Sequence, residues 1–192
     1  MLKRDLRIRY SQLRNSLAPQ ELLNFSLSIA NKLLELPIWS FDYYHLFLPI
    51  SKKKEIDTTF ILSILQGKDK NIVLPKVGSN GNLRHFLLTD ATKIKENDWG
   101  IPEPVDGIAI TPKKIDVVIL PLLAFDKKGN RVGYGKGFYD RFLNSCRPEV
   151  LKVGLSLFEA EEETIETNRH DVRLDYCVTP KRIYNFSDDS SE

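Results

Sequence analysis

The sequence predicts an α/β protein in three layers, α/β/α, around a mostly parallel central sheet. A run of four apolar residues at 117–120, three of them β-branched, is typical of a strand buried on both faces. Two other strand-like runs, at 43–50 and 71–75, enclose a helical pattern at 58–66. Such a strand–helix–strand unit pairs its strands in parallel through a right-handed crossover. At 192 residues, 42% of them hydrophobic, the chain most simply forms one domain over residues 1–186, because two domains would each have a marginal core.

Two helices are expected before the first strand. The buried face of the first helix recurs at helical spacing and consists of Leu6, Tyr10, Leu13 and Leu17. The second helix starts at Pro19 and stops before Pro37, and its buried positions are Leu22, Phe25, Ile29, Leu33 and Leu36. Lys3, Arg7 and Arg14 share another face of the first helix, for which a solvated charged surface is the ordinary interpretation.

The rest of the chain supplies further strands and one long loop. The pair Asn80-Gly81 predicts a turn that leads into a strand at 83–88. The segment 93–112 is expected to be irregular, and so long a loop in a compact domain tends to be functional. Trp99 within it offers either a stacking face for a planar heterocycle or a plug for the core. A strand at 150–157, a solvated helix start at 159–163, one or two short strands within 172–186 and a disordered tail at 187–192 complete the prediction.

A glycine loop with the features of an anion-binding site follows the strand at 117–120. Gly133, Gly135 and Gly137 precede a helix on which Phe138 and Phe142 share one face. Glycines let the backbone approach a phosphate, while converging N–H groups and the positive end of the following helix attract it. The spacing fits neither the Walker pattern nor the dinucleotide pattern, so a flexible turn is the alternative.

The charges around these glycines favour a polyphosphate over a plain turn. Arg131, Lys136 and Arg141 flank the loop at a density that a turn does not need. Asp140, in the first turn of the helix, can hold a Mg²⁺ ion carried by the polyphosphate. Alternatively, it is an acidic residue favoured by the helix N-terminus alone.

Composition excludes several other classes of protein. A net charge of +2 and a pI near 8.4 are too mild to imply a nucleic-acid partner. Cys146 and Cys177 lack metal or redox spacing and are expected to be reduced thiols in the cytoplasm. The charged N-terminus and the lack of a long apolar run argue against a signal peptide or a membrane anchor. Its three histidines show no zinc spacing.

The stretch 123–141 resembles the glycine-loop signature of the 5-formyltetrahydrofolate cyclo-ligases, also called 5,10-methenyltetrahydrofolate synthetases. The matching letters are LAFD at 123–126 and GNRVGYGKGFYDR at 129–141. Weaker matches are the basic start at 3–7, EIDT at 55–58, GIPEP at 100–104 and HD at 170–171. Lys136 replaces a frequent glycine and Phe138 a frequent tyrosine, so Phe138 lacks a hydroxyl that a substrate could have used. The resemblance implies a Rossmann-like fold of the NagB/RpiA/CoA transferase-like kind.

The resemblance to the cyclo-ligases also implies an ATP-dependent enzyme with defined site residues. The residues expected at ATP are Lys3, Arg4, Asp5, Leu6, Arg7, Arg131, Val132, Gly133, Tyr134, Gly135, Lys136, Gly137, Phe138 and Tyr139. Those expected at the folate are Ile50, Glu55, Trp99, Tyr134, Gly135, Lys136, Gly137 and Phe138, where Glu55 hydrogen-bonds the pterin ring. Asp140 and Asp171 are expected at Mg²⁺, and Arg131 and Lys136 are expected to be catalytic.

The reaction of the family converts a poor electrophile into a good one. The formyl oxygen on N5 of 5-formyltetrahydrofolate takes the γ-phosphoryl group of ATP, N10 attacks the formyl carbon, and phosphate leaves. Such chemistry asks the protein for positioning and charge stabilisation. We predict that Lys136 bridges the transferring phosphoryl group and the formyl oxygen, because it is the one cation inside the glycine loop.

Two other functions remain open from the sequence. A nucleotide-binding regulatory protein would keep the loop but would not use a folate. An RNA-associated protein would present Lys3, Arg4, Arg7, Arg9 and Arg14 to phosphates, with steep salt dependence. The favoured interpretation is a cytoplasmic monomer that acts on 5-formyltetrahydrofolate, with or without a polyglutamate tail, and has no nucleic-acid or membrane partner.

Overall fold

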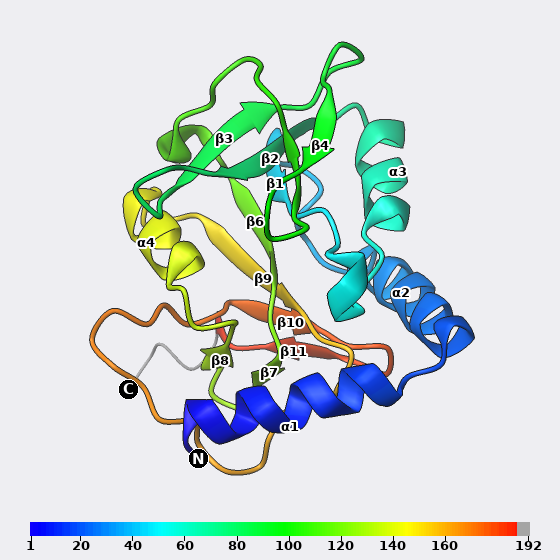
Figure 1. Ribbon diagram of the computed structural model, residues 1–192, viewed down its shortest axis with the longest axis vertical. Helices are drawn as coiled ribbons and strands as arrows, with labels where there is room; N and C mark the ends of the chain where they lie inside the picture. The colour runs from blue at the N-terminus through cyan, green and yellow to red at the C-terminus, as the bar shows by residue number, and fades with distance from the viewer. Residues whose placement is uncertain (188–192) are drawn as a thin grey trace.

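Seven strands form the central sheet of the protein, whose computed structural model describes residues 1–187 (Figure 1). They are β1 (Tyr43–Leu46), β2 (Asn71–Val77), β3 (Leu83–Leu87), β6 (Val117–Pro121), β9 (Leu151–Leu155), β10 (Tyr176–Val178) and β11 (Ile183–Asn185). Their order across the sheet is β11-β10-β9-β6-β1-β2-β3. The strands from β10 to β2 pair in parallel, and β11 and β3 add antiparallel edges. The mostly parallel sheet predicted from the sequence is therefore confirmed.

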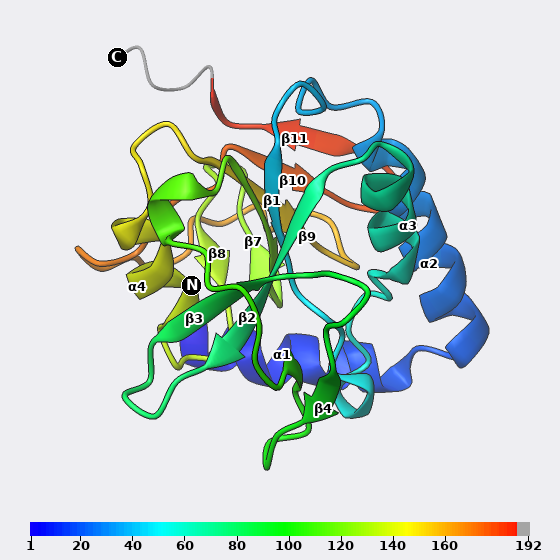
Figure 2. The same cartoon turned by 90° about the horizontal axis from the view of Figure 1, so that it is seen from above.

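Helices cover both faces of this sheet, as Figures 1 and 2 show. They are α1 (Lys3–Ser16), α2 (Pro19–Leu33), α3 (Thr59–Gly67) and α4 (Phe138–Ser145). Leu33 and Ile61 of α2 and α3 belong to the core on one face, and Phe142 of α4 packs into the core on the other. The expected three layers are confirmed. No helix within residues 1–187 combines the length and apolar character needed to cross a membrane.

Two small ribbons lie outside the main sheet. One pairs β4 (Ile94–Glu96) with β5 (Pro102–Pro104), and the other pairs β7 (Ala124–Phe125) with β8 (Arg131–Val132). The prediction of an irregular segment at 93–112 is therefore wrong in part. Its two strands are too short for a periodic pattern, and the turn between them is fixed by Asn97, whose side-chain oxygen accepts the N–H groups of Trp99 and Ile101. The short 3₁₀ turns η1 (Ser51–Lys53) and η2 (Pro112–Lys114) complete the fold.

The two N-terminal helices, the helix expected at 58–66 and the helix after the glycine loop are present, but two details differ. On α1, Leu6 and Tyr10 are buried as expected, whereas Leu13 is 37% exposed and Arg14 is buried in its place. The segment 159–163 does not begin a helix. Its backbone is held instead by β7, because the Glu161 N–H group donates to the Phe125 carbonyl. The expected disordered tail lies, apart from Ser187, outside the described residues.

The topology creates one edge suited to a ligand. β1 lies between β2, which follows it through α3, and β6, which comes later in the chain. The chain therefore reverses its direction of travel across the sheet at β1, and ligands of such sheets bind beyond the carboxyl ends of the strands at this point. The residues after β1, the end of β2 and Pro121 at the end of β6 all border one cavity.

Candidate active site

A cavity of about 670 Å³ opens at the carboxyl ends of β1, β2 and β6. Its volume lies within the usual range for ligand pockets, about 300–1,000 Å³. Part of its wall is apolar and comes from separate strands and loops, including Phe47, Leu48, Val77, Leu83 and Ile101. The glycine loop and the start of α4 form another part of the wall, which includes the charged residues Lys136 and Asp140.

The conformation of the glycine loop depends on its glycines. Gly135 and Gly137 have positive φ angles of 91° and 69°, which side chains rarely allow. A Cβ atom at Gly135 would lie 3.1 Å from the guanidinium carbon of Arg7, and one at Gly137 would lie 2.8 Å from Arg141. Gly133 has open space instead, with no atom of the described residues within 4 Å of an added Cβ. The backbone at Gly133 is thus accessible to a ligand, while the other two glycines hold the shape of the loop.

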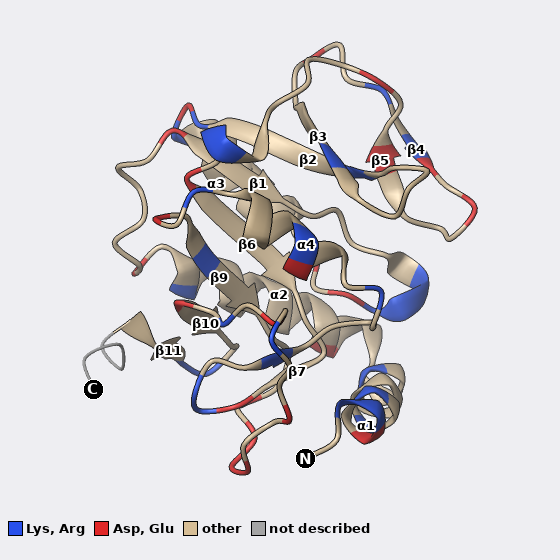
Figure 3. Ribbon diagram, turned by 90° about the vertical axis from the view of Figure 1, so that its left-hand side faces the viewer, with Lys and Arg blue, Asp and Glu red and all other residues tan. Residues whose placement is uncertain are grey.

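Cations from distant parts of the chain meet beside this loop. The Arg7 guanidinium donates to the Gly133 carbonyl at 2.9 Å, and Lys3 forms a salt bridge with Asp171. Arg131 lies deeper, with only 6% of its side chain exposed. Burial lowers the pKa of Arg131, and Asp140 opposes this effect, so the guanidinium remains charged. These contacts show that the basic face of α1, blue in Figure 3, turns partly toward the cavity.

Lys136 differs from the other cations of the site. It is exposed, lines the cavity, and its ammonium group makes no hydrogen bond or salt bridge within the described part of the chain. Its backbone carbonyl alone is engaged, as an acceptor for Arg141 at 3.1 Å. The charge of Lys136 is therefore free to meet an anionic ligand.

Two carboxylates, those of Asp140 and Asp171, interact with Arg131 and line the cavity. Asp140 Oδ1 accepts from Arg131 at 2.7 Å and from the Val172 N–H group at 3.3 Å. Burial alone would raise the pKa of Asp171, but Lys3, the Asn168 N–H group and nearby Arg131 hold it below its ordinary value. Residues 1–187 contain no group of three or more histidine, cysteine or acidic side chains arranged around a metal ion. A Mg²⁺ ion commonly needs fewer protein ligands, because phosphate oxygens and waters complete its shell.

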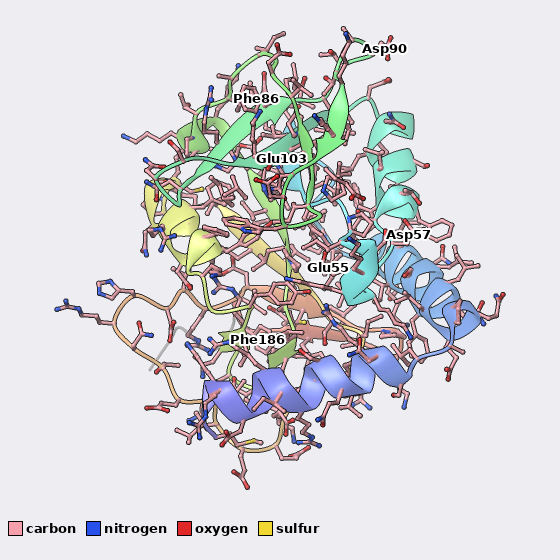
Figure 4. The ribbon with its side chains drawn as sticks, in the orientation of Figure 1. Glu55, Asp57, Phe86, Asp90, Glu103 and Phe186 are labelled. Carbon is pink, nitrogen blue, oxygen red and sulfur yellow. The ribbon has the colours of Figure 1, made fainter. Side chains whose placement is uncertain are left out.

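Glu55 forms the wall of the cavity beside η1 (Figure 4). Its side chain is buried, with the residue 4% exposed, and it accepts hydrogen bonds from the Tyr134 hydroxyl at 2.6 Å and the Ile50 N–H group at 2.7 Å. Burial raises the pKa of Glu55, and these two bonds together with Arg14 and Lys53 oppose the rise. A buried carboxylate held in this way suits a ligand with adjacent N–H donors.

Trp99 and Phe138 provide an aromatic surface at the cavity. Their rings stack with centroids 6.3 Å apart and an angle of 25° between planes. Trp99 is 58% exposed, so it is not a plug of the core. Of the two interpretations left open by the sequence, a stacking face for a planar ring is the one that this geometry favours.

Most of the predicted site residues border this cavity. They are Lys3, Arg7, Ile50, Glu55, Trp99, Arg131, Gly133, Tyr134, Gly135, Lys136, Gly137, Phe138, Tyr139, Asp140 and Asp171. Arg4, Asp5, Leu6 and Val132 do not line it. Arg4 and Asp5 are exposed and contact each other, while Leu6 and Val132 belong to a buried cluster.

Sequence reasoning missed other contributors. Lys53 and Asn168 border the cavity, and buried Arg14 reaches it through Tyr134. Arg14 could have been found from its helical spacing with Lys3 and Arg7. The inward contacts of these three cations also argue against the RNA-associated alternative, which needs them on an open face.

Comparison with known proteins decides the family. The sequence matches the 5-formyltetrahydrofolate cyclo-ligase family over residues 1–180. The chain belongs to this family. It is 28% identical to the 5-formyltetrahydrofolate cyclo-ligase of Mus musculus, over 90% of this chain and 91% of the mouse protein. Against the Escherichia coli K12 cyclo-ligase the identity is 29%, over 91% and 98% of the two chains.

The fold agrees with that assignment to the cyclo-ligases. The solution structure of Aquifex aeolicus 5,10-methenyltetrahydrofolate synthetase superposes with a TM-score of 0.82 and 31% identity, covering 97% of this chain and 93% of that one. The family resemblance and the α/β fold class expected from the sequence are thus both confirmed. Cys146 and Cys177 are free thiols, also as expected.

Proposed function

We propose that this cyclo-ligase family member converts 5-formyltetrahydrofolate into 5,10-methenyltetrahydrofolate, with ATP consumed to ADP and phosphate. One observation carries the proposal: the same cavity is lined by a cationic glycine loop and by a buried carboxylate with stacked aromatic rings. A protein that only bound a nucleotide would have no use for the second set of groups. Family membership supports the same reaction.

The glycine loop fits a triphosphate. Lys3, Arg7, Arg131 and Lys136 surround it, and the open backbone at Gly133 allows close approach. ATP supplies the phosphoryl group that makes the formyl oxygen a leaving group. Asp140 and Asp171 would hold a Mg²⁺ ion that neutralises phosphate charge, because both carboxylates line the cavity and interact with Arg131.

The part of the wall around Glu55 and Trp99 fits the folate. The pterin ring is planar and carries adjacent N–H donors, which match the carboxylate of Glu55. The Trp99–Phe138 pair offers a flat apolar surface to an aromatic part of the substrate. Lys136, whose ammonium group has no partner within residues 1–187, lines the cavity and would stabilise the negative charge that develops on the oxygens during phosphoryl transfer. Arg131, buried and fixed by Asp140 and the Val172 carbonyl, contributes a second charge with a defined orientation.

The test is to mix the purified protein with 5-formyltetrahydrofolate and Mg-ATP and to follow the absorbance of methenyltetrahydrofolate. We expect product only when the nucleotide is present, with one ADP released for each product formed. ATP binding without any folate-dependent ADP release would instead identify the nucleotide-binding regulatory protein. The proposal also includes cytoplasmic action as a monomer, on a folate with or without a polyglutamate tail. Rates with both folates would test the folate preference, and a sedimentation experiment would test the monomeric state.

A further inference from the structure

A chain of three buried or partly buried polar groups connects α1 to the wall of the cavity. Arg14 Nη1 donates to the Tyr134 hydroxyl at 2.9 Å, and that hydroxyl donates to Glu55 Oε1 at 2.6 Å. Tyr134 belongs to the glycine loop, so one side chain joins both halves of the site. None of the three residues is adjacent to another in the sequence.

Arg14 is an unusual residue to find in this position. It is 3% exposed, and no carboxylate forms a salt bridge with it among residues 1–187. Its Nη2 group donates to the Leu122 carbonyl at 2.5 Å, while its Nε group is buried without a hydrogen-bond partner. A buried cation is costly unless its charge is compensated. Its charge is compensated by Glu55, which Arg14 reaches through the Tyr134 hydroxyl.

We infer that Arg14 and Tyr134 are positioning residues that keep the Glu55 carboxylate ionised and oriented for the folate. The inference rests on the proposed function, because Glu55 is assigned there to the pterin ring. Arg14 polarises the Tyr134 hydroxyl, which strengthens the hydrogen bond that the hydroxyl donates to the carboxylate. One Glu55 oxygen is thereby fixed by Tyr134 and the other by the Ile50 N–H group. The remaining lone pairs are available to the ligand.

The charged and titratable groups around Glu55 all lie on elements that pack against it. Arg14 comes from α1, Lys53 from η1, Tyr134 from the glycine loop and Tyr139 from α4. Lys53 also places its ammonium 3.9 Å from the centre of the Tyr134 ring. Burial raises the pKa of Glu55, whereas the Tyr134 hydroxyl, Arg14 and Lys53 favour the ionised form. Removing the hydroxyl should therefore raise the pKa of the carboxylate further.

The test is Tyr134→Phe, which removes the hydroxyl but keeps the ring that Lys53 contacts. The affinity for 5-formyltetrahydrofolate is measured by calorimetry between pH 5 and 8, and at pH 7 it should be about tenfold weaker for Tyr134→Phe than for the wild type. As the pH is lowered, the affinity of the variant should begin to fall about one pH unit higher than that of the wild type. Arg14→Met should shift this fall in affinity in the same direction. Far-UV circular dichroism and urea unfolding report whether each variant is folded. If Arg14→Met does not fold, the result for Tyr134→Phe alone tests the inference.

Two further variants separate positioning from a general structural effect. Tyr10→Phe is the matched control, because Tyr10 on α1 donates an equally short 2.6 Å bond to Glu161 but does not line the cavity. It should leave the pH profile of binding unshifted. In a Glu55→Gln background, Tyr134→Phe should cause no further shift, because the titrating carboxylate is absent. A wild-type profile for Tyr134→Phe, or a shift that persists with Glu55→Gln, would overturn the inference. ATP-dependent product formation by the wild type would leave the proposed function standing in that case.

Discussion

Two buried histidines should make the folded protein sensitive to acid. His45 is 0% and His85 is 3% exposed, and none of their ring nitrogens has a hydrogen-bond partner within the described residues. The rings lie 5.7 Å apart by centroid, and His85 packs 4.0 Å from the ring of Phe142 on α4. Protonation would place a charge among apolar groups that hold α4, and with it one wall of the cavity.

The size of the effect follows from the pKa of His85, which burial lowers from 6.5 to about 4. Between these two pH values the unfolded chain binds more protons than the folded one, so the free energy of unfolding falls as the pH is lowered. The pKa shift of His85 can lower the free energy of unfolding by about 3 kcal/mol in total. About 2 kcal/mol of this decrease should occur between pH 8 and pH 5. Burial and the neighbouring His85 lower the pKa of His45 as well, so wild-type protein should lose still more.

Urea unfolding of wild-type protein and His85→Phe at pH 8 and pH 5 tests this prediction. At pH 8 the variant should be as stable as the wild type or more stable, because an apolar ring replaces unpaired buried nitrogens. At pH 5 it should gain about 2 kcal/mol relative to the wild type. The control is His170→Gln, which removes an exposed histidine that belongs to neither core cluster and should not reproduce the gain in stability of His85→Phe at pH 5. Parallel losses of stability in wild type and His85→Phe would refute the reasoning.

Three other variants test the site and the core. Lys136→Met should lower kcat about a hundredfold through loss of charge stabilisation, whereas Lys128→Met, which removes an exposed cation outside the cavity, should not. Equal rates for the two variants would exclude the role of Lys136. Asp140→Asn should raise the Mg²⁺ concentration for half-maximal rate about tenfold, and an unaltered Mg²⁺ titration would remove Asp140 from the metal site. Gly154→Ala should cost about 1–3 kcal/mol of unfolding free energy, because the added Cβ would lie 2.6 Å from Leu122. A wild-type urea midpoint would contradict that overlap.

Local patterns in the sequence were enough to predict most helices, most strands of the main sheet and the glycine loop. A helical face or a buried strand is set by residues within a few positions of one another, so spacing alone predicts it. Gly135 and Gly137 were likewise predictable as loop-forming residues, and their positive φ angles explain why they are glycines. The prediction failed at Glu161, where pairing with β7 replaced the expected helix. Nothing near that residue in the sequence indicates its distant partner.

The sequence alone also pointed to the family and to the glycine-loop residues that line the cavity, since these lie in one continuous motif. Tertiary structure decided which groups meet across the cavity. Lys3 contacts Asp171 at a separation of 168 residues, and Tyr134 reaches Glu55 across 79. The burial of Arg14 and of the two histidines could not be predicted from the sequence either. Composition and periodicity indicate the helix face or strand position of a side chain but not its partners. Those partners depend on how β1, β2 and β6 are ordered in the sheet, and that order is fixed only when the whole core packs.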